Sequence, residues 1–177
     1  MKGSPASDRG LVVLGIDPGL RATGWGALAL VSAGAGEEIR ILGYGVVATQ
    51  GGASLPERLR RLFSGLREAI RRWQPAEVSV EEAFVAANKR VAIAMGEARG
   101  VALLAAAEAG LPVFEYSASE VKQAVTGYGR GSKEQVQEML RLQFGLEAAP
   151  QPADAADALA TALCHLVRRR TEARLAG

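Results

Sequence analysis

Residues 11–19 read Leu-Val-Val-Leu-Gly-Ile-Asp-Pro-Gly. A short apolar run that ends at Asp17, Pro18 and Gly19 is typical of a strand buried in a sheet, because Pro and Gly interrupt regular structure. Asp17 stands at the carboxyl end of this strand, where open α/β sheets tend to bind ligands. Asp before Pro-Gly is also a common turn former, so a functional role and a simple turn are both open for Asp17.

Two further strands are expected after this one, at residues 23–30 and 38–49. The links between the three strands are short, which favours antiparallel pairing. The spacing then changes to that of a helix. Ser54-Leu-Pro-Glu57 is a capping box, and apolar residues from Leu59 to Trp73 recur at helical intervals.

Strands and helices alternate over the rest of the chain. The remaining expected elements are strand 77–84, helix 88–109, strand 111–115, helix 117–125, helix 133–144 and a last helix from about 153 to 170. Strands that are joined by helical crossovers pair in parallel. The sequence therefore predicts an α/β fold, with a mixed sheet of three antiparallel strands followed by parallel ones and with helices on its faces.

Length and composition indicate one soluble domain. The 177 residues carry a net charge of only +2, which neither demands nor excludes nucleic acid. The single cysteine, Cys164, cannot form an internal disulfide, and no apolar run approaches the ~18 residues that span a bilayer. We expect a flexible extension at 1–10, one domain at 11–170, a tail at 171–177, and a cytoplasmic location.

Two pairs of carboxylates join Asp17 as candidates. Glu81 and Glu82 lie in an expected strand, where alternation points one side chain to each face without telling which is special. Asp154 and Asp157 lie three residues apart near a helix start and share one face. Acidic residues there also stabilise the helix dipole, and paired glutamates at a strand end are often merely solvated.

Oxygen ligands without His or Cys suit a hard cation such as Mg²⁺ better than zinc. The carboxylates are far apart in sequence, however, so only a fold can bring them together. Positive charge is found near the loop at 127–132, where Lys122, Arg130 and Lys133 surround a Gly-rich stretch that can follow a phosphate backbone closely.

Four segments resemble the motifs of the RuvC family of Holliday-junction resolvases. They are GIDPGLRATGWG at 15–26, VEEAFVAANKR at 80–90, the stretch from GEARG to GSKEQV at 96–136, and PADAADALATALCH at 152–165. Their order and spacing are those of the family. The resemblance implies an RNase H-like fold, in agreement with the predicted order of strands and helices.

The resemblance also implies residue roles. The metal-binding and catalytic carboxylates would be Asp17, Glu81 rather than Glu82, Asp154 and Asp157, and Lys133 would act beside the scissile phosphate. Phe84 would stack on an unpaired base near the crossover. The DNA-binding residues would be Phe84, Asn88, Lys122, Arg130 and Lys133.

The implied activity is the resolution of four-way junctions by paired, symmetric nicks that depend on two Mg²⁺ ions, with Mn²⁺ as a substitute. The implied partners are the junction, a second copy of the chain and a RuvAB branch-migration complex. Two other readings stay open: an RNase H-like nuclease for RNA–DNA hybrids or another branched substrate, and a junction-binding protein without catalysis. An ATPase of the actin-like class is disfavoured, because its second, similar half would not fit in this length.

Overall fold

The protein is described by a computed structural model that covers residues 10–34, 36–82 and 88–176. The elements follow in the order β1 (Leu11–Asp17), β2 (Ala22–Ala33), β3 (Gly36–Ala48), α1 (Leu55–Trp73), β4 (Glu77–Glu81), α2 (Lys89–Glu108), β5 (Val113–Tyr116), α3 (Ala118–Thr126), α4 (Lys133–Gln143) and α5 (Ala153–Ala176). None of the helices in these ranges is long and apolar enough to cross a membrane.

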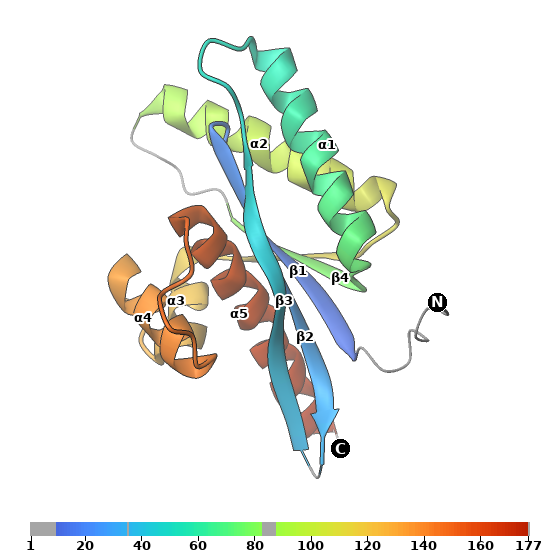
Figure 1. Ribbon diagram of the computed structural model, residues 1–177, viewed down its shortest axis with the longest axis vertical. Coiled ribbons are helices and arrows are strands. Elements are labelled where there is room, and N and C mark those ends of the chain that lie inside the picture. Colours follow the sequence, from blue (N-terminus) through green and yellow to red (C-terminus); the bar gives the residue numbers. More distant parts are fainter. Residues whose placement is uncertain (1–9, 35, 83–87, 177) are drawn as a thin grey trace.

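The five strands form one mixed sheet in the order β3-β2-β1-β4-β5. β1, β2 and β3 pair antiparallel, whereas β1 with β4 and β4 with β5 pair parallel. Helices α1 and α2 cover one face, and α5 with α3 and α4 covers the other (Figure 1). The predicted mixed sheet with flanking helices is confirmed.

β1 is apolar up to its last residue, Asp17, and both of its faces are covered. Leu14 and Ile16 pack into the cluster under α1 and α2, whereas Val13 packs into the cluster under α5. Successive side chains of a strand point to opposite faces, so Asp17 falls on the same face as Val13. The last residue of β1 therefore faces the helix α5.

Two glycines let α5 approach the sheet closely. A Cβ atom at Gly15 would clash with the backbone of Ala158, and one at Gly24 would clash with the carbonyl of Asp154. Both helix residues lie in the first two turns of α5. Because these two strand positions have no side chain, the start of α5 can pack directly against β1 and β2.

The bounds of several elements differ from the predicted ones. β4 ends at Glu81 rather than at residue 84, and β5 covers Val113–Tyr116 rather than 111–115, because the amide of Leu111 still bonds to the end of α2. α5 continues to Ala176, so residues that we expected as a tail are helical. No Gly or Pro interrupts the sequence between residues 153 and 176, which was the signal for this longer helix.

Candidate active site

Asp17 and Glu81 end two neighbouring parallel strands. The register pairs Gly15 with Ser79 and Ile16 with Val80, and Asp17 and Glu81 are the next residues along each strand. Glu81 alternates with Val80, which packs under α1 and α2, so Glu81 lies on the α5 face together with Asp17. Strand register therefore separates Glu81 from Glu82, which local alternation alone could not do.

The first turns of α5 bring Asp154 and Asp157 to the same corner. Ala155, Ala156 and Ala158 are fully buried beneath the helix, and their small side chains allow the close approach to the sheet. The side chain of Asp157 is only 14% exposed. Four carboxylates from β1, β4 and α5, which are up to 140 positions apart in the chain (157 minus 17), thus come together at one sheet edge.

Burial and repulsion raise the pKa values of two of these carboxylates, Asp17 and Glu81. The pKa of Asp17 is raised from 3.8 to about 8, first by burial and then by the negative charges of Glu81, Asp157 and Asp154. The pKa of Glu81 is also raised, mainly by burial and next by Asp157. Burial and neighbouring negative charge thus make the ionisation of Asp17 and Glu81 harder.

Lys133 supplies part of that charge. It is the first residue of α4, whose start is defined by a capping box between Ser132 and Gln135. Its Nζ atom donates to Oδ2 of Asp157 over 2.8 Å, and this hydrogen bond is the main reason that the pKa of Lys133 is raised. Lys133 opposes the shift of Asp17, so its charge acts on the whole cluster.

The donor set fits a hard divalent cation, since it consists of carboxylate oxygens in a partly buried place that lacks positive charge. Within the residues that the structure describes, no three His, Cys, Asp or Glu side chains yet converge in the way that holds an ion. One of the four carboxylates, Asp157, is paired with Lys133 in this arrangement.

The predicted DNA-binding residues have different environments. Lys122 is half-buried on α3, and its charge lowers the pKa of Glu81, so it lies beside the carboxylates. Arg130 is exposed in the loop between α3 and α4. Asn88 caps α2, because its Oδ1 atom accepts hydrogen bonds from the amides of Arg90 and Val91. Phe84 lies outside the described residues.

Local sequence signals missed two groups next to the site. Met95 and Arg99 of α2 line a small pocket with Asp17, Glu81 and Glu82. The guanidinium of Arg99 is held there by an ion pair with Glu115 of β5. Neither residue stands in a pattern that indicates catalysis, and only the packing of α2 against the sheet brings them to the pocket.

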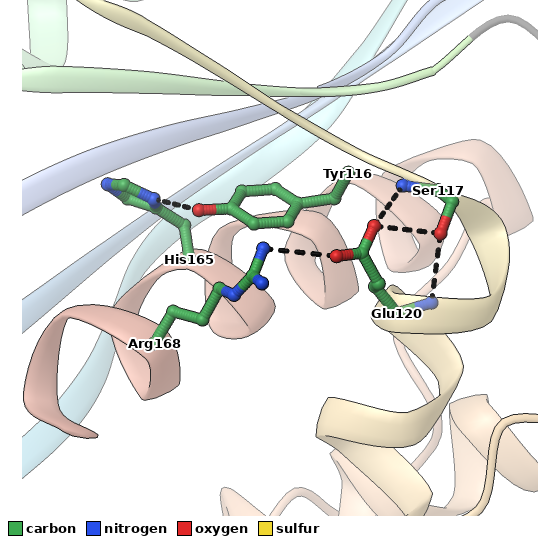
Figure 2. A network of polar contacts seen from close by, with 5 residues as sticks. All are labelled: Tyr116, Ser117, Glu120, His165 and Arg168. Atoms are coloured by element: carbon green, nitrogen blue, oxygen red, sulfur yellow. Dashed lines mark hydrogen bonds and ion pairs between the residues drawn. The ribbon is translucent and has the colours of Figure 1, made fainter. Parts of the chain in front are cut away.

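A buried polar network fastens α5 to the sheet behind the site (Figure 2). The hydroxyl of Tyr116 lies 2.7 Å from Nδ1 of His165, and Nε2 of His165 lies 2.6 Å from Oε2 of Glu77. A carboxylate only accepts, so we assign the imidazole proton to Nε2 and the hydroxyl donation to Nδ1. His165 is 1% exposed, so the network is buried at its centre.

The same network extends to α3. Arg168 lies over the ring of Tyr116 and pairs with Glu120, which in turn caps α3 through Ser117 (Figure 2). Since α3 carries Lys122 and α5 carries Asp154 and Asp157, the network fixes these helices relative to one another. The network therefore helps to keep Lys122, Asp154 and Asp157 in position.

The comparisons with known proteins agree with this geometry. The sequence profile of the family described as "Crossover junction endodeoxyribonuclease RuvC" matches residues 13–165. The protein of that name from Rubrobacter xylanophilus is 50% identical over 162 residues, which cover 92% of this chain and 88% of the relative.

Two solved structures from Thermus thermophilus are similar over most of their length. One is described as a RuvC structure, with a TM-score of 0.82, 41% identity, and coverage of 92% of this chain and 97% of the other. The second is RuvC in complex with Holliday junction substrate, with a TM-score of 0.83, 40% identity, and coverage of 92% and 96%. The predicted RNase H-like fold is thereby confirmed, and the chain belongs to the family of crossover junction endodeoxyribonucleases known as RuvC.

Proposed function

We propose that this protein is a structure-specific endonuclease that resolves Holliday junctions during homologous recombination and DNA repair. It nicks two strands of like polarity at symmetric positions. The observation that carries the proposal is the proximity of Asp17, Glu81, Asp154 and Asp157 to one another and to Lys133 at the carboxyl ends of β1 and β4. The likeness to a Thermus thermophilus RuvC bound to a Holliday junction supports the choice of substrate.

The proposed cofactor is Mg²⁺, with two ions held by the four carboxylates and with Mn²⁺ as a substitute. Such ions polarise the attacking water and stabilise the leaving oxygen of the phosphodiester. The raised pKa values of Asp17 and Glu81 support this assignment, because a bound cation removes the repulsion that causes part of those shifts.

The protein's own residues then have separate tasks. Asp17 and Glu81 stand on strand ends, so their backbone positions are rigid and the site keeps its shape. Lys133, once released from Asp157, is free to place its ammonium against the negative charge that builds up on the phosphate. Lys122 and Arg130 would contact neighbouring phosphates, and Phe84 would stack on an unpaired base. The Nδ2 group of Asn88 would donate to DNA, while its Oδ1 atom keeps the cap of α2.

A homodimer would match the approximate two-fold symmetry of a four-way junction. Ile93 and Leu104 of α2 are 62% and 53% exposed. They share one helix face with Gly96 and Gly100, where an added Cβ would meet nothing. An apolar face with two glycines allows close packing against a second copy, so Ile93→Lys should shift the protein towards the monomer in sedimentation equilibrium.

Two further parts of the proposal concern the cell: a cytoplasmic location and cooperation with the RuvAB branch-migration complex. RuvAB association can be measured by co-sedimentation on a junction.

The substrate can be identified with the purified protein, incubated with a four-way junction, a plain duplex or an RNA–DNA hybrid, each with Mg²⁺ or EDTA.

Symmetric nicks that require Mg²⁺ and occur only in the junction support the proposal. Cutting of the hybrid would instead assign the protein as a ribonuclease. Tight junction binding without any product would leave a structural role.

A further inference from the structure

Tyr128 lies in the Gly-rich loop between the two helices that bear Lys122 and Lys133. The loop reads Gly127-Tyr128-Gly129-Arg130-Gly131, and the side chain of Tyr128 is 60% exposed. It is the most exposed aromatic side chain among the described residues, since the next, Tyr44, is 38% exposed. An apolar ring of this size in water is unfavourable in itself, so a partner that covers it would stabilise the bound state.

The backbone of this loop is held in place although the ring is free. The amide of Tyr128 donates to Oγ1 of Thr126 over 3.1 Å, and its carbonyl accepts from the amide of Gly131 over 3.3 Å. Gly127 ends α3 in the left-handed conformation, with φ of 72°. Gly129 lies so close to Ser119 that a Cβ would come within 2.9 Å of its Oγ. The ring is therefore presented from an ordered turn.

The two lysines that flank this loop, Lys122 and Lys133, both act on the carboxylates, so the loop lies near them. Lys122 acts on the pKa of Glu81, and Lys133 contacts Asp157. Tyr128 stands five residues before Lys133, which limits their Cα separation to at most ~18 Å. The nucleotides next to a scissile phosphate bound at Lys133 would therefore lie within about this distance of Tyr128.

From these observations we propose that Tyr128 is a further DNA-contacting residue, which stacks its ring on a nucleobase of the strand that is cut. The inference rests on the proposed junction-resolving function and adds a base contact to it. Bases next to a crossover are the ones most easily unstacked, and every base has an aromatic face, so a tyrosine ring can accept any of them. Arg130 and the glycines on either side allow the backbone phosphates to come close at the same time.

The test measures junction affinity with Ca²⁺ in place of Mg²⁺, so that binding is separated from cleavage. Tyr128→Phe should bind like the wild type, because the ring is kept. Tyr128→Ala and Tyr128→Leu should each bind about tenfold more weakly, which corresponds to about 1.4 kcal/mol. Tyr44→Ala, on β3, is the matched control and should change nothing. A junction with 2-aminopurine beside the cleavage point should lose fluorescence with the wild type and not with Tyr128→Leu.

The outcomes distinguish a failure of the proposed junction-resolving function from a failure of the proposed role of Tyr128. If the wild type binds a junction no better than a duplex, the proposed function fails. If it prefers the junction but Tyr128→Ala binds equally well, the role of Tyr128 is wrong. Full affinity of Tyr128→Leu together with unchanged 2-aminopurine fluorescence would also overturn stacking. Because the side chain is exposed, circular dichroism should give the same fold and melting temperature for all of these variants.

Discussion

Asp17→Asn should abolish cleavage and at the same time stabilise the protein in the absence of metal. The change keeps the shape of the side chain but removes a charge that burial and three neighbouring carboxylates oppose. The pKa of Asp17 in the folded protein, about 8, lies above its ordinary value of 3.8. The unfolded chain therefore releases this proton at lower pH than the folded chain. Stability from this group is complete below about pH 4 and is lost as pH rises to about 8.

The magnitude follows from the size of the shift. One unit of pKa corresponds to ~1.36 kcal/mol, so a change from 3.8 to about 8 sets an upper limit of about 6 kcal/mol at pH 8. Part of the shift comes from the negative charges of Glu81, Asp157 and Asp154, so this free energy does not belong to Asp17 alone. We therefore expect Asp17→Asn to raise the free energy of unfolding by about 2–3 kcal/mol at pH 8. In a protein of this size that is an increase of roughly 5–10 °C in melting temperature.

The assay is thermal unfolding in EDTA at several values between pH 4.5 and 8.5. The gain from Asp17→Asn should be small at the acid end, grow with pH and level off near pH 8. Glu37→Gln changes an exposed carboxylate on β3, and its stability difference from the wild type should not increase with pH. Junction binding by Asp17→Asn should be retained. A variant that is less stable than the wild type at every pH, or one that still cuts at the wild-type rate, would refute the reasoning.

Three further changes test the surroundings of the site. Lys133→Met removes the side-chain cation that competes with a metal ion for Asp157. Mn²⁺ affinity in the absence of DNA, measured by electron paramagnetic resonance, should therefore rise about five- to tenfold. Weaker Mn²⁺ binding would contradict this competition. Tyr116→Phe leaves the buried Nδ1 of His165 without a donor and should cost about 1–3 kcal/mol in urea unfolding; no loss would mean that the hydroxyl contributes nothing. Gly24→Ala should lower both the melting temperature and Mn²⁺ affinity, because the added methyl group pushes the start of α5 away; an unchanged affinity would show that α5 can shift without harm.

Acid should weaken the fold through His165. Burial lowers the pKa of this imidazole below its ordinary 6.5, although the carboxylate of Glu77 opposes that shift. The unfolded chain therefore takes up the proton first as pH falls, and the contribution of His165 to stability is lost below about pH 6.5.

Much of the fold was accessible from local patterns. The apolar run at 11–17, the capping boxes at Ser54 and Ser132, and the alternation of strands and helices gave the element order and the mixed sheet. The position of Asp17 at a strand end was also predicted. Its catalytic role was predicted only through the family resemblance, because the same Asp-Pro-Gly sequence suits a plain turn.

Other parts depend on contacts that no local pattern contains. The choice between Glu81 and Glu82 follows physically from the register of β4 against β1, which is a long-range property. The network around His165 draws its partners from Glu77 and Tyr116, on two other elements, so a lone histidine on a helix gave no sign of it. Asn88 was predicted as a DNA contact, and the structure adds that its Oδ1 atom caps α2, which the sequence analysis did not foresee.

The most direct test of the account compares two adjacent carboxylates in one assay. Cleavage of a four-way junction in Mg²⁺ is measured under single-turnover conditions for the wild type, Glu81→Gln and Glu82→Gln. Glu81 lies on the α5 face beside Asp17 and Asp157, so Glu81→Gln should reduce the rate by at least a hundredfold (about 2.7 kcal/mol or more) while junction binding persists. Glu82→Gln should cut at nearly the wild-type rate. Equal rates for Glu81→Gln and the wild type, or a loss confined to Glu82→Gln, would contradict the central claim that the carboxylates on the α5 face carry out the cleavage.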